Sequence, residues 1–379
     1  MNMILNEEQR LLKETAHGFL QSHAPVAAMR KLRDDRDTLG YSAELWRQLV
    51  ELGIASIVLP EEYGGLDFGF LGLGAVLEEM GRNLTASPLF SSVVLGASAL
   101  ELGGSEQQRQ EIFPQLVEGK LSLALAIDEQ QHHQPLATAV KLQIEGDALR
   151  ITGSKVFVQD GHSADKLLVV TRSSGKPGDR QGISLVLVDR ETAGIEVTRT
   201  HMMDGRNAAK ITFNDVEITP EQLVGPINQG MDILQPVLDR GAICMAAEML
   251  GGIQEVFDRT IEYLKEREQF DVKIGSFQAL QHRAAIMYCK IEQCRSAVLD
   301  ALAALDNHST DVSLKASQAK ALVNDCYILV SNEAVQMHGG MGITDELDIG
   351  LYLKRARVSV QIMGDSLYHR DRYASLLGY

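Results

Sequence analysis

The sequence predicts an α+β protein in which a β domain lies between two helical domains. Apolar residues recur at helical spacing in the first third of the chain, and this spacing returns after Gly225. Between roughly 121 and 213, short apolar runs alternate with Gly, Asp and Ser, which is typical of antiparallel strands. A chain of 379 residues is long enough for two or three domains. We therefore expect a helical domain at 1–120, an antiparallel β domain at 121–225 and a helical domain at 226–379.

Capping residues mark the helices of the first domain. Asn6 and Ser42 each precede apolar residues at helical spacing, so each is expected to be an N-cap. Further helical stretches are expected near 71–82 and 88–102, and another from Ser105 to about Val117.

Short apolar and β-branched runs predict the strands of the middle domain. Glu145, Gly146 and Asp147 separate two of these runs and indicate a hairpin. The predicted strands are 121–127, 141–144, 149–152, 155–158, 166–171, 183–188, 195–200 and 209–213.

A very long amphipathic helix begins the last domain. Its apolar face runs from Leu234 to Leu264 at helical spacing. Three more helical segments are expected, at 276–306, 311–339 and 343–378.

Composition excludes several classes of protein. The net charge is −15, from 36 basic and 51 acidic residues, and such a surface disfavours general nucleic-acid binding. The longest apolar run, 121–127, is far shorter than the roughly 20 residues of a membrane span, and no basic region precedes an apolar stretch at the N-terminus. Four cysteines without a C-x-x-C pair predict reduced core thiols and a cytoplasmic location. The adjacent His132 and His133 favour a polar loop over a metal site, so no metal is expected.

Two segments of the last domain combine residues that suit phosphates and rings. Arg267 and Phe270 follow the long helix and Gln278 comes shortly after, a set that suits a phosphate and a stacked ring. A solvated helix end with a core Phe is the simpler interpretation of that spacing. Gln336 precedes a turn with Gly339 and Gly340, where a ligand can approach backbone N–H groups. A helix C-cap explains such a turn equally well.

A third segment, 151–165, has a strand, a turn and a strand with an aromatic residue, and alone it predicts a plain hairpin. In this order and with these gaps, the three segments resemble the acyl-CoA dehydrogenase family. Leu-Pro-Glu-Glu-Tyr-Gly-Gly at 59–65 and the stretch 213–225 extend the resemblance over essentially the whole chain. The family fold implies an N-terminal helical domain, a middle β domain and a C-terminal four-helix bundle. Three stretches, 246–251, 278–283 and 363–366, are similar to the small-subunit type of pimeloyl-CoA dehydrogenase.

The resemblance implies FAD bound between subunits. Arg267 and Phe270 match positions that hold the pyrophosphate and adenine side of a neighbouring subunit's FAD, with Gln278 beside them. Gln336, Gly339 and Gly340 match the turn that approaches the ADP part of FAD.

Two positions of the middle domain match the residues around the flavin ring. Phe157 matches the aromatic residue against which the ring rests, and Gln159 replaces the Thr that usually bonds it. A larger departure lies at 128–135, where Asp-Glu-Gln-Gln-His-His-Gln-Pro replaces the family's Thr-Glu-Pro-x-Ala-Gly-Ser-Asp. An Asp close to the flavin raises the cost of reduction to the anionic form.

The implied reaction is α,β-desaturation of an acyl-CoA, in which a carboxylate removes the α-proton and hydride passes to flavin N5. The family's usual Glu position is occupied by Gly364, and Asp365 follows it. Other members supply Glu on the long helix, where Asp239 stands about half a turn out of register. Asp239 and Asp365 are therefore the candidate bases, and Glu248 is a third carboxylate on the same helix.

Three functions follow from the resemblance. The first is an FAD-dependent acyl-CoA dehydrogenase that passes electrons to an electron-transfer flavoprotein and assembles as a tetramer. The second is a non-catalytic FAD-binding subunit of a hetero-oligomer with a second acyl-CoA dehydrogenase-like chain. The third is an oxidase or monooxygenase, which rapid O₂ consumption would distinguish. A homo-oligomer is expected in the first case.

Overall fold

The computed structural model describes residues 5–146 and 148–379. Tertiary contacts group the chain into two compact units. One is a helical unit made of the chain up to Lys31, Phe70–Thr85 and Ala242–Tyr379. The other is a β unit made of Leu32–Gly69 and Ala86–Gly241. The N-terminal third of the chain is thus shared between the two units.

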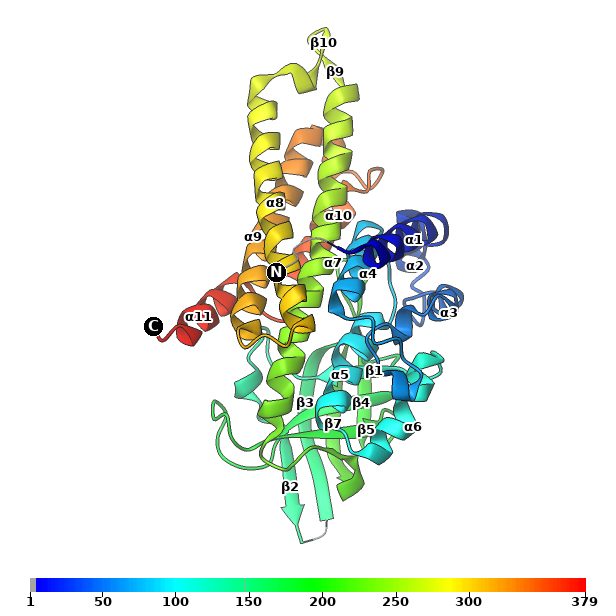
Figure 1. Cartoon of the computed structure of the whole chain (residues 1–379), viewed down its shortest axis with the longest axis vertical. Helices are drawn as coiled ribbons and strands as arrows, with labels where there is room; N and C mark the ends of the chain where they lie inside the picture. The colour runs from blue at the N-terminus through cyan, green and yellow to red at the C-terminus, as the bar shows by residue number, and fades with distance from the viewer. Residues whose placement is uncertain (1–4, 147) are drawn as a thin grey trace. The chain divides into compact units, whose positions relative to one another are not determined.

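The helical unit is built from long antiparallel helices. Figure 1 shows α7 and α8 side by side and joined by the small β9–β10 hairpin. Arg295 of α8 donates a hydrogen bond of 2.7 Å to Gln254 of α7. The elements of this unit are α1 (Glu7–His23), α4 (Phe70–Arg82), the later part of α7 (Gly230–Glu266), β9 (Glu268–Gln269), β10 (Val272–Lys273), η6 (Ile274–Ser276), α8 (Gln278–Asp306), α9 (Val312–His338), η7 (Gly339–Ile343), α10 (Ile349–Ser359) and α11 (Ser366–Leu376).

Glycines fix the crossing of α4 and α7 in the helical unit. A Cβ on Gly81 of α4 would lie 1.8 Å from the carbonyl oxygen of Glu248, and one on Gly251 of α7 would lie 1.7 Å from that of Glu78. The two helix backbones therefore touch, which only glycine permits. This contact attaches α4, from the N-terminal third, to the C-terminal helices.

The β unit contains one mixed sheet and several short helices. The strand order is β6-β7-β3-β2-β4-β5-β8, and β1 pairs with β4. Most pairs are antiparallel, but β1 with β4 and one pair between β2 and β4 are parallel. Its strands are β1 (Leu123–Ala126), β2 (Lys141–Glu145), β3 (Ala148–Gln159), β4 (Lys166–Arg172), β5 (Ile183–Asp189), β6 (Ile195–His201), β7 (Asn207–Ile218) and β8 (Leu223–Val224). Its helical elements are α3 (Ala43–Glu51), η1 (Ile54–Ser56), η2 (Glu61–Tyr63), η3 (Leu89–Ala97), α5 (Ser98–Gly103), α6 (Glu106–Val117), η4 (Pro135–Ala137), η5 (Pro220–Gln222) and the first turns of α7.

The predicted order of helices, strands and helices is confirmed, with local corrections. Asn6, Ser42 and Ser105 are N-caps whose side chains accept backbone hydrogen bonds. Helix α2 (Val26–Asp34) was not predicted, and Leu89–Ala97 is a π-helix. The three domain boundaries remain predictions.

Strand β3 is continuous, although the sequence predicts two strands at 149–152 and 155–158. Two register shifts against β7 occur within it, between Ile151 and Gly153 and between Lys155 and Val158. These β-bulges bend the strand without ending it, which explains why the apolar alternation is interrupted. The hairpin between β2 and β3 is present, and Asp147 of its turn lies outside the described residues.

The C-terminal segment forms more helices than the sequence predicts. The expected helix at 343–378 becomes α10 and α11, because Gly364 has φ +101° and Asp365 caps α11. Of the four free cysteines, Cys289 is exposed, which corrects the expectation that all are core residues. Among the described helices, none has the length and apolar character of a membrane span.

Candidate functional site

The β3 bulge places an aromatic side chain on the surface of the β unit. Phe157 has φ +52° and is 47% exposed, whereas Lys155 and Val158 on either side of it are buried. A bulky residue in the left-handed region costs about 1–3 kcal/mol and persists only where the surroundings impose it. The fold therefore maintains a strained backbone that exposes the Phe157 ring.

Gln159, the last residue of β3, carries an unusual polar atom. Its Oε1 is buried and accepts no hydrogen bond from the described residues. Leaving such an acceptor unpaired costs about 1–3 kcal/mol. An exposed aromatic face two residues from a buried, unpaired acceptor fits a planar ring that bears N–H groups. FAD has such a ring, so this pair of residues fits the cofactor.

A clamp of hydrogen bonds holds the loop that precedes β2. Glu129 Oε1 accepts a 2.7 Å bond from Lys155 Nζ, and its carboxylate also accepts from the N–H groups of Ala139 and Val140. Lys155 Nζ also donates to the carbonyl of Ile127 at 2.8 Å. Complete burial lowers the pKa of Lys155 to about 8, against an opposing effect from Glu129. The loop that replaces the expected Gly/Ser turn is therefore anchored to β3.

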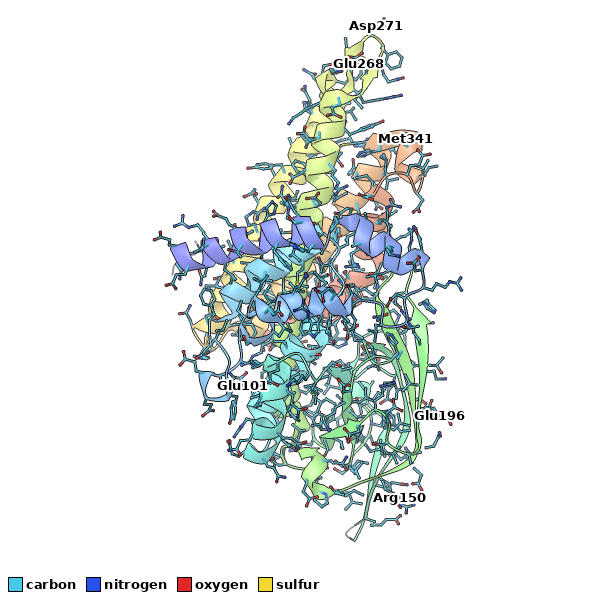
Figure 2. The ribbon with its side chains drawn as sticks, turned by 90° about the vertical axis from the view of Figure 1, so that its right-hand side faces the viewer. Glu101, Arg150, Glu196, Glu268, Asp271 and Met341 are labelled. Carbon is cyan, nitrogen blue, oxygen red and sulfur yellow. The ribbon has the colours of Figure 1, made fainter. Side chains whose placement is uncertain are left out.

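The helical unit presents a second aromatic residue at the end of α7. Phe270 has φ +57° and is 86% exposed, and its ring lies edge-on to Phe277 at 6.2 Å. Arg267 and Gln278 are also exposed. Figure 2 shows Glu268 and Asp271 at the tip of the α7–α8 connection that carries these side chains. An Arg and a largely exposed aromatic at this tip suit a ligand or subunit from outside the chain.

The Gly-rich turn lies at the same end of the helical unit. Tyr263 of α7 stacks on His338 of α9 with ring centroids 4.2 Å apart, which brings the two helix ends together. Gly339 has φ +60°, and a Cβ on Gly339 or Gly340 would meet nothing within 4 Å. Gln336, one turn earlier, is exposed. The structure thus brings the Arg267 and Gln336 segments to one end of the helical unit.

Two candidate carboxylates on α7 are buried in different units. Asp239 is 3% exposed and its Oδ1 lies 3.4 Å from Gln235 Nε2 in the β unit. The adjacent Arg240 forms an ion pair of 2.6 Å with Glu101. Glu248 is 8% exposed and faces Arg355 at 3.5 Å in the helical unit. Glu248 is therefore held in an internal ion pair.

Asp365 has a structural role in the helical unit. Its Oδ1 accepts a 2.9 Å hydrogen bond from the N–H of Tyr368 and caps α11. Beside it, a Cβ on Gly364 would lie 2.4 Å from the Tyr368 ring. No side chain fits at position 364 without displacing that ring. A carboxylate at the family's usual position is thereby excluded in this packing.

The sequence did not single out Lys320. This fully buried lysine donates hydrogen bonds to Asn324 at 2.7 Å and to the carbonyls of Ser359 and Gly364 at 3.1 and 3.2 Å. The sequence could have indicated this buried lysine, because Lys320 stands among alanines and a valine on an otherwise apolar helix face. Within the described residues, no three His, Cys, Asp or Glu side chains converge on a possible metal position.

Comparison with known proteins places these features in a family. The acyl-CoA dehydrogenase N-terminal, middle and C-terminal domain models match residues 6–120, 124–216 and 228–377. The chain belongs to the acyl-CoA dehydrogenase family. The predicted fold and enzyme class are thereby confirmed, as is FAD as the cofactor of this family of oxidoreductases.

Individual relatives in the family share most of their length with this chain. Mitochondrial isovaleryl-CoA dehydrogenase of Pongo abelii is 30% identical over 93% of this chain and 85% of that protein. The acyl-CoA dehydrogenase IpdE2 of Mycolicibacterium smegmatis is 31% identical over 95% and 96%. A chain of the ChsE4-ChsE5 complex from Mycobacterium tuberculosis is similar with a TM-score of 0.90 and 26% identity, covering 100% of this chain and 99% of that one.

Because Asp365 caps α11 with a hydrogen-bond acceptor, we expect stability to fall when that acceptor is removed but not when only the negative charge is removed. Asp365→Ala should lower the free energy of unfolding by about 1 kcal/mol, because the Tyr368 N–H loses its acceptor. Asp365→Asn should leave it nearly unchanged, since Asn is an equally good N-cap. Urea unfolding measures both, with the exposed Asp371→Ala in the same helix as control. Equal losses in the Ala and Asn variants would contradict the cap.

The buried Lys155 predicts a pH dependence of stability. Its pKa of about 8 in the folded protein lies below the ordinary 10.5, so between these values the unfolded chain binds more protons than the folded one. The free energy of unfolding should therefore rise with pH across this window, by on the order of 1–3 kcal/mol. Lys155→Met should remove that rise, whereas the exposed Lys141→Met should keep it. Unfolding curves at several pH values test this, and a parallel pH profile for Lys155→Met and wild type would refute it.

Proposed function

We propose that this chain is an FAD-dependent acyl-CoA dehydrogenase that introduces an α,β double bond into an acyl-CoA thioester. The observation that carries the proposal is the strained, exposed Phe157 beside the unpaired buried oxygen of Gln159. A planar ring resting on Phe157 would bury the aromatic face and give Gln159 a donor. The identity to isovaleryl-CoA dehydrogenase over most of both chains supports a CoA thioester as substrate.

The exposed residues at the α7–α8 connection and at the Gly339–Gly340 turn are assigned to contacts with the diphosphate and adenine of FAD. Arg267 provides planar N–H donors that suit phosphate oxygens, and Phe270 and Gln278 flank it for the adenine side. The open space over Gly339 and Gly340 lets backbone N–H groups approach the ADP part, with Gln336 beside them. Because these side chains point out of the chain's own fold, we assign them to FAD shared with a neighbouring subunit.

The base that removes the α-proton is assigned to Asp239. The bound FAD supplies the acceptor for the β-hydride, so the protein must supply a carboxylate for the proton. Asp365 is the other candidate, but its carboxylate is already engaged as the cap of α11. Asp239 is buried in the β unit, the unit that also holds Phe157 and Gln159. An electron-transfer flavoprotein is the proposed electron acceptor.

A second candidate function is a non-catalytic, FAD-binding subunit of a heteromeric acyl-CoA dehydrogenase. Gly364 favours it, because the Tyr368 ring leaves no room for a carboxylate at that position. The similarity to a chain of the ChsE4-ChsE5 complex supports an assembly of two related chains. In such an assembly the partner chain would provide the base, and this chain would keep its FAD contacts.

The visible spectrum of the purified protein distinguishes these two functions. We expect a yellow protein whose flavin absorbance bleaches on anaerobic addition of an acyl-CoA from a series of chain lengths. Asp239→Asn should slow bleaching at least about 100-fold, because a general base is lost, whereas Asp365→Asn should bleach normally. Bleaching only after co-purification with a second subunit would select the non-catalytic role. Flavin that no acyl-CoA bleaches, with or without a partner, would contradict both functions.

Arg267 is expected to contribute to FAD affinity. Arg267→Ala should weaken FAD binding about tenfold or more, because a charge-assisted hydrogen bond to phosphate contributes about 1.5–3 kcal/mol. Lys265→Ala is the matched control, since this exposed lysine lies in the last turn of α7 and pairs with Glu262. The dissociation constant of FAD, measured by ultrafiltration, should change only in the first variant. Equal constants for both variants would remove Arg267 from the site.

A further inference from the structure

The helical unit contains a cavity of about 150 Å³ between four of its helices. Its walls are mainly apolar and come from three helices, with Leu71 and Ala75 of α4, Ala247 and Leu250 of α7, and Val298 and Leu302 of α8. None of the residues that line it is among those assigned to FAD or to the base. Protein interiors rarely leave a space this large, because the atoms around it lose packing contacts.

The helices around the cavity are held apart by contacts that they already make. A Cβ on Gly251 of α7 would lie 1.7 Å from the carbonyl oxygen of Glu78 of α4, so these two backbones touch. Leu302 of α8 packs over Gly74 of α4, where a Cβ would lie 2.4 Å from the leucine Cδ1. Helix α4 therefore cannot move closer to α7 or to α8, and the short side chain of Ala75 leaves the space between them unfilled.

Three charged side chains form the polar edge of the cavity, and they are bound to one another. The two carboxylate oxygens of Glu78 are engaged separately, one by Lys13 of α1 at 2.5 Å and one by Arg295 of α8 at 3.0 Å. Arg295 also donates a 2.7 Å hydrogen bond to Gln254. A charged ligand would have to break this network or enter the apolar space without a partner, and both cost free energy. The cavity therefore favours a neutral ligand.

We propose that this cavity is a binding site for a neutral hydrocarbon group of about the size of a benzene ring. An apolar cavity of similar volume, lined by Leu, Ile and Phe, stays dry and binds benzene. Leu, Val and Ala side chains provide the same kind of wall here. The ligand regains the packing contacts that the empty space forfeits, and it leaves the ion pairs at the edge intact.

Thermal unfolding of the purified full chain, with benzene as the ligand, tests the site. Benzene at ten times its dissociation constant should raise the midpoint temperature by about 2 °C, because it binds the folded chain and not the unfolded one. Benzoate and benzylamine at the same concentration should leave the midpoint unchanged, since their charges find no partner in the cavity. The measurement requires no flavin, so its result is independent of the proposed function.

Variants that fill the cavity show where benzene binds. Ala75→Leu places a larger side chain in the cavity and should abolish the benzene shift. Ala279→Leu is the matched control, because Ala279 is exposed on α8 and does not line the cavity, and it should keep the shift. Ala247→Val reduces the same space from α7 and decides the question if Ala75→Leu does not fold.

Loss of the shift in a folded filled variant, with the shift kept in Ala279→Leu, supports the site. A shift that persists in every folded filled variant would place benzene elsewhere and overturn the proposal. The absence of a shift in the wild-type protein, or its loss in Ala279→Leu, would overturn it as well. An equal shift with benzoate or benzylamine would contradict a site for a neutral group.

Discussion

The arrangement of the β unit depends on one bulge in strand β3. In a regular strand, residues 155 and 157 would face the same side. The bulge breaks this alternation, so that Lys155 turns into the interior while the Phe157 ring remains exposed. Buried Lys155 then requires an acidic partner, because an unpaired charge in the protein interior costs free energy. Glu129 provides it and at the same time anchors the loop that carries Asp128.

Glycine imposes the corresponding constraints in the helical unit. Gly81 and Gly251 let α4 and α7 cross with their backbones in contact, which joins a segment of the N-terminal third to the C-terminal helices. Gly364 acts differently, because its left-handed backbone and the Tyr368 ring together exclude any side chain. The packing that ends α10 and starts α11 is therefore the same packing that removes the expected catalytic position. Gly364 therefore determines both the local packing and the lack of a carboxylate at this position.

Much of the fold could be predicted because it depends on local patterns. Helical spacing, the caps Asn6 and Ser42, and the short apolar runs between 121 and 213 act over a few residues. The order of Arg267, Phe270 and the Gly339–Gly340 turn was enough to suggest the family, since ligand-binding segments keep their spacing. Helix α2 escaped prediction because Val26–Asp34 has only two buried side chains to mark its inner face.

The sequence by itself determined the class of fold, the family and the absence of Glu from position 364. Only the three-dimensional structure decided what each charged side chain does, because its partner is set by backbone turns and packing, whether that partner lies a few residues away or far along the chain. Asp365 became a cap through Tyr368, and Lys155 met Glu129 across 26 positions. His133 turned inward onto Asp128 while His132 remained exposed. Such pairings depend on burial and distance, which three-dimensional packing sets and local sequence patterns do not encode.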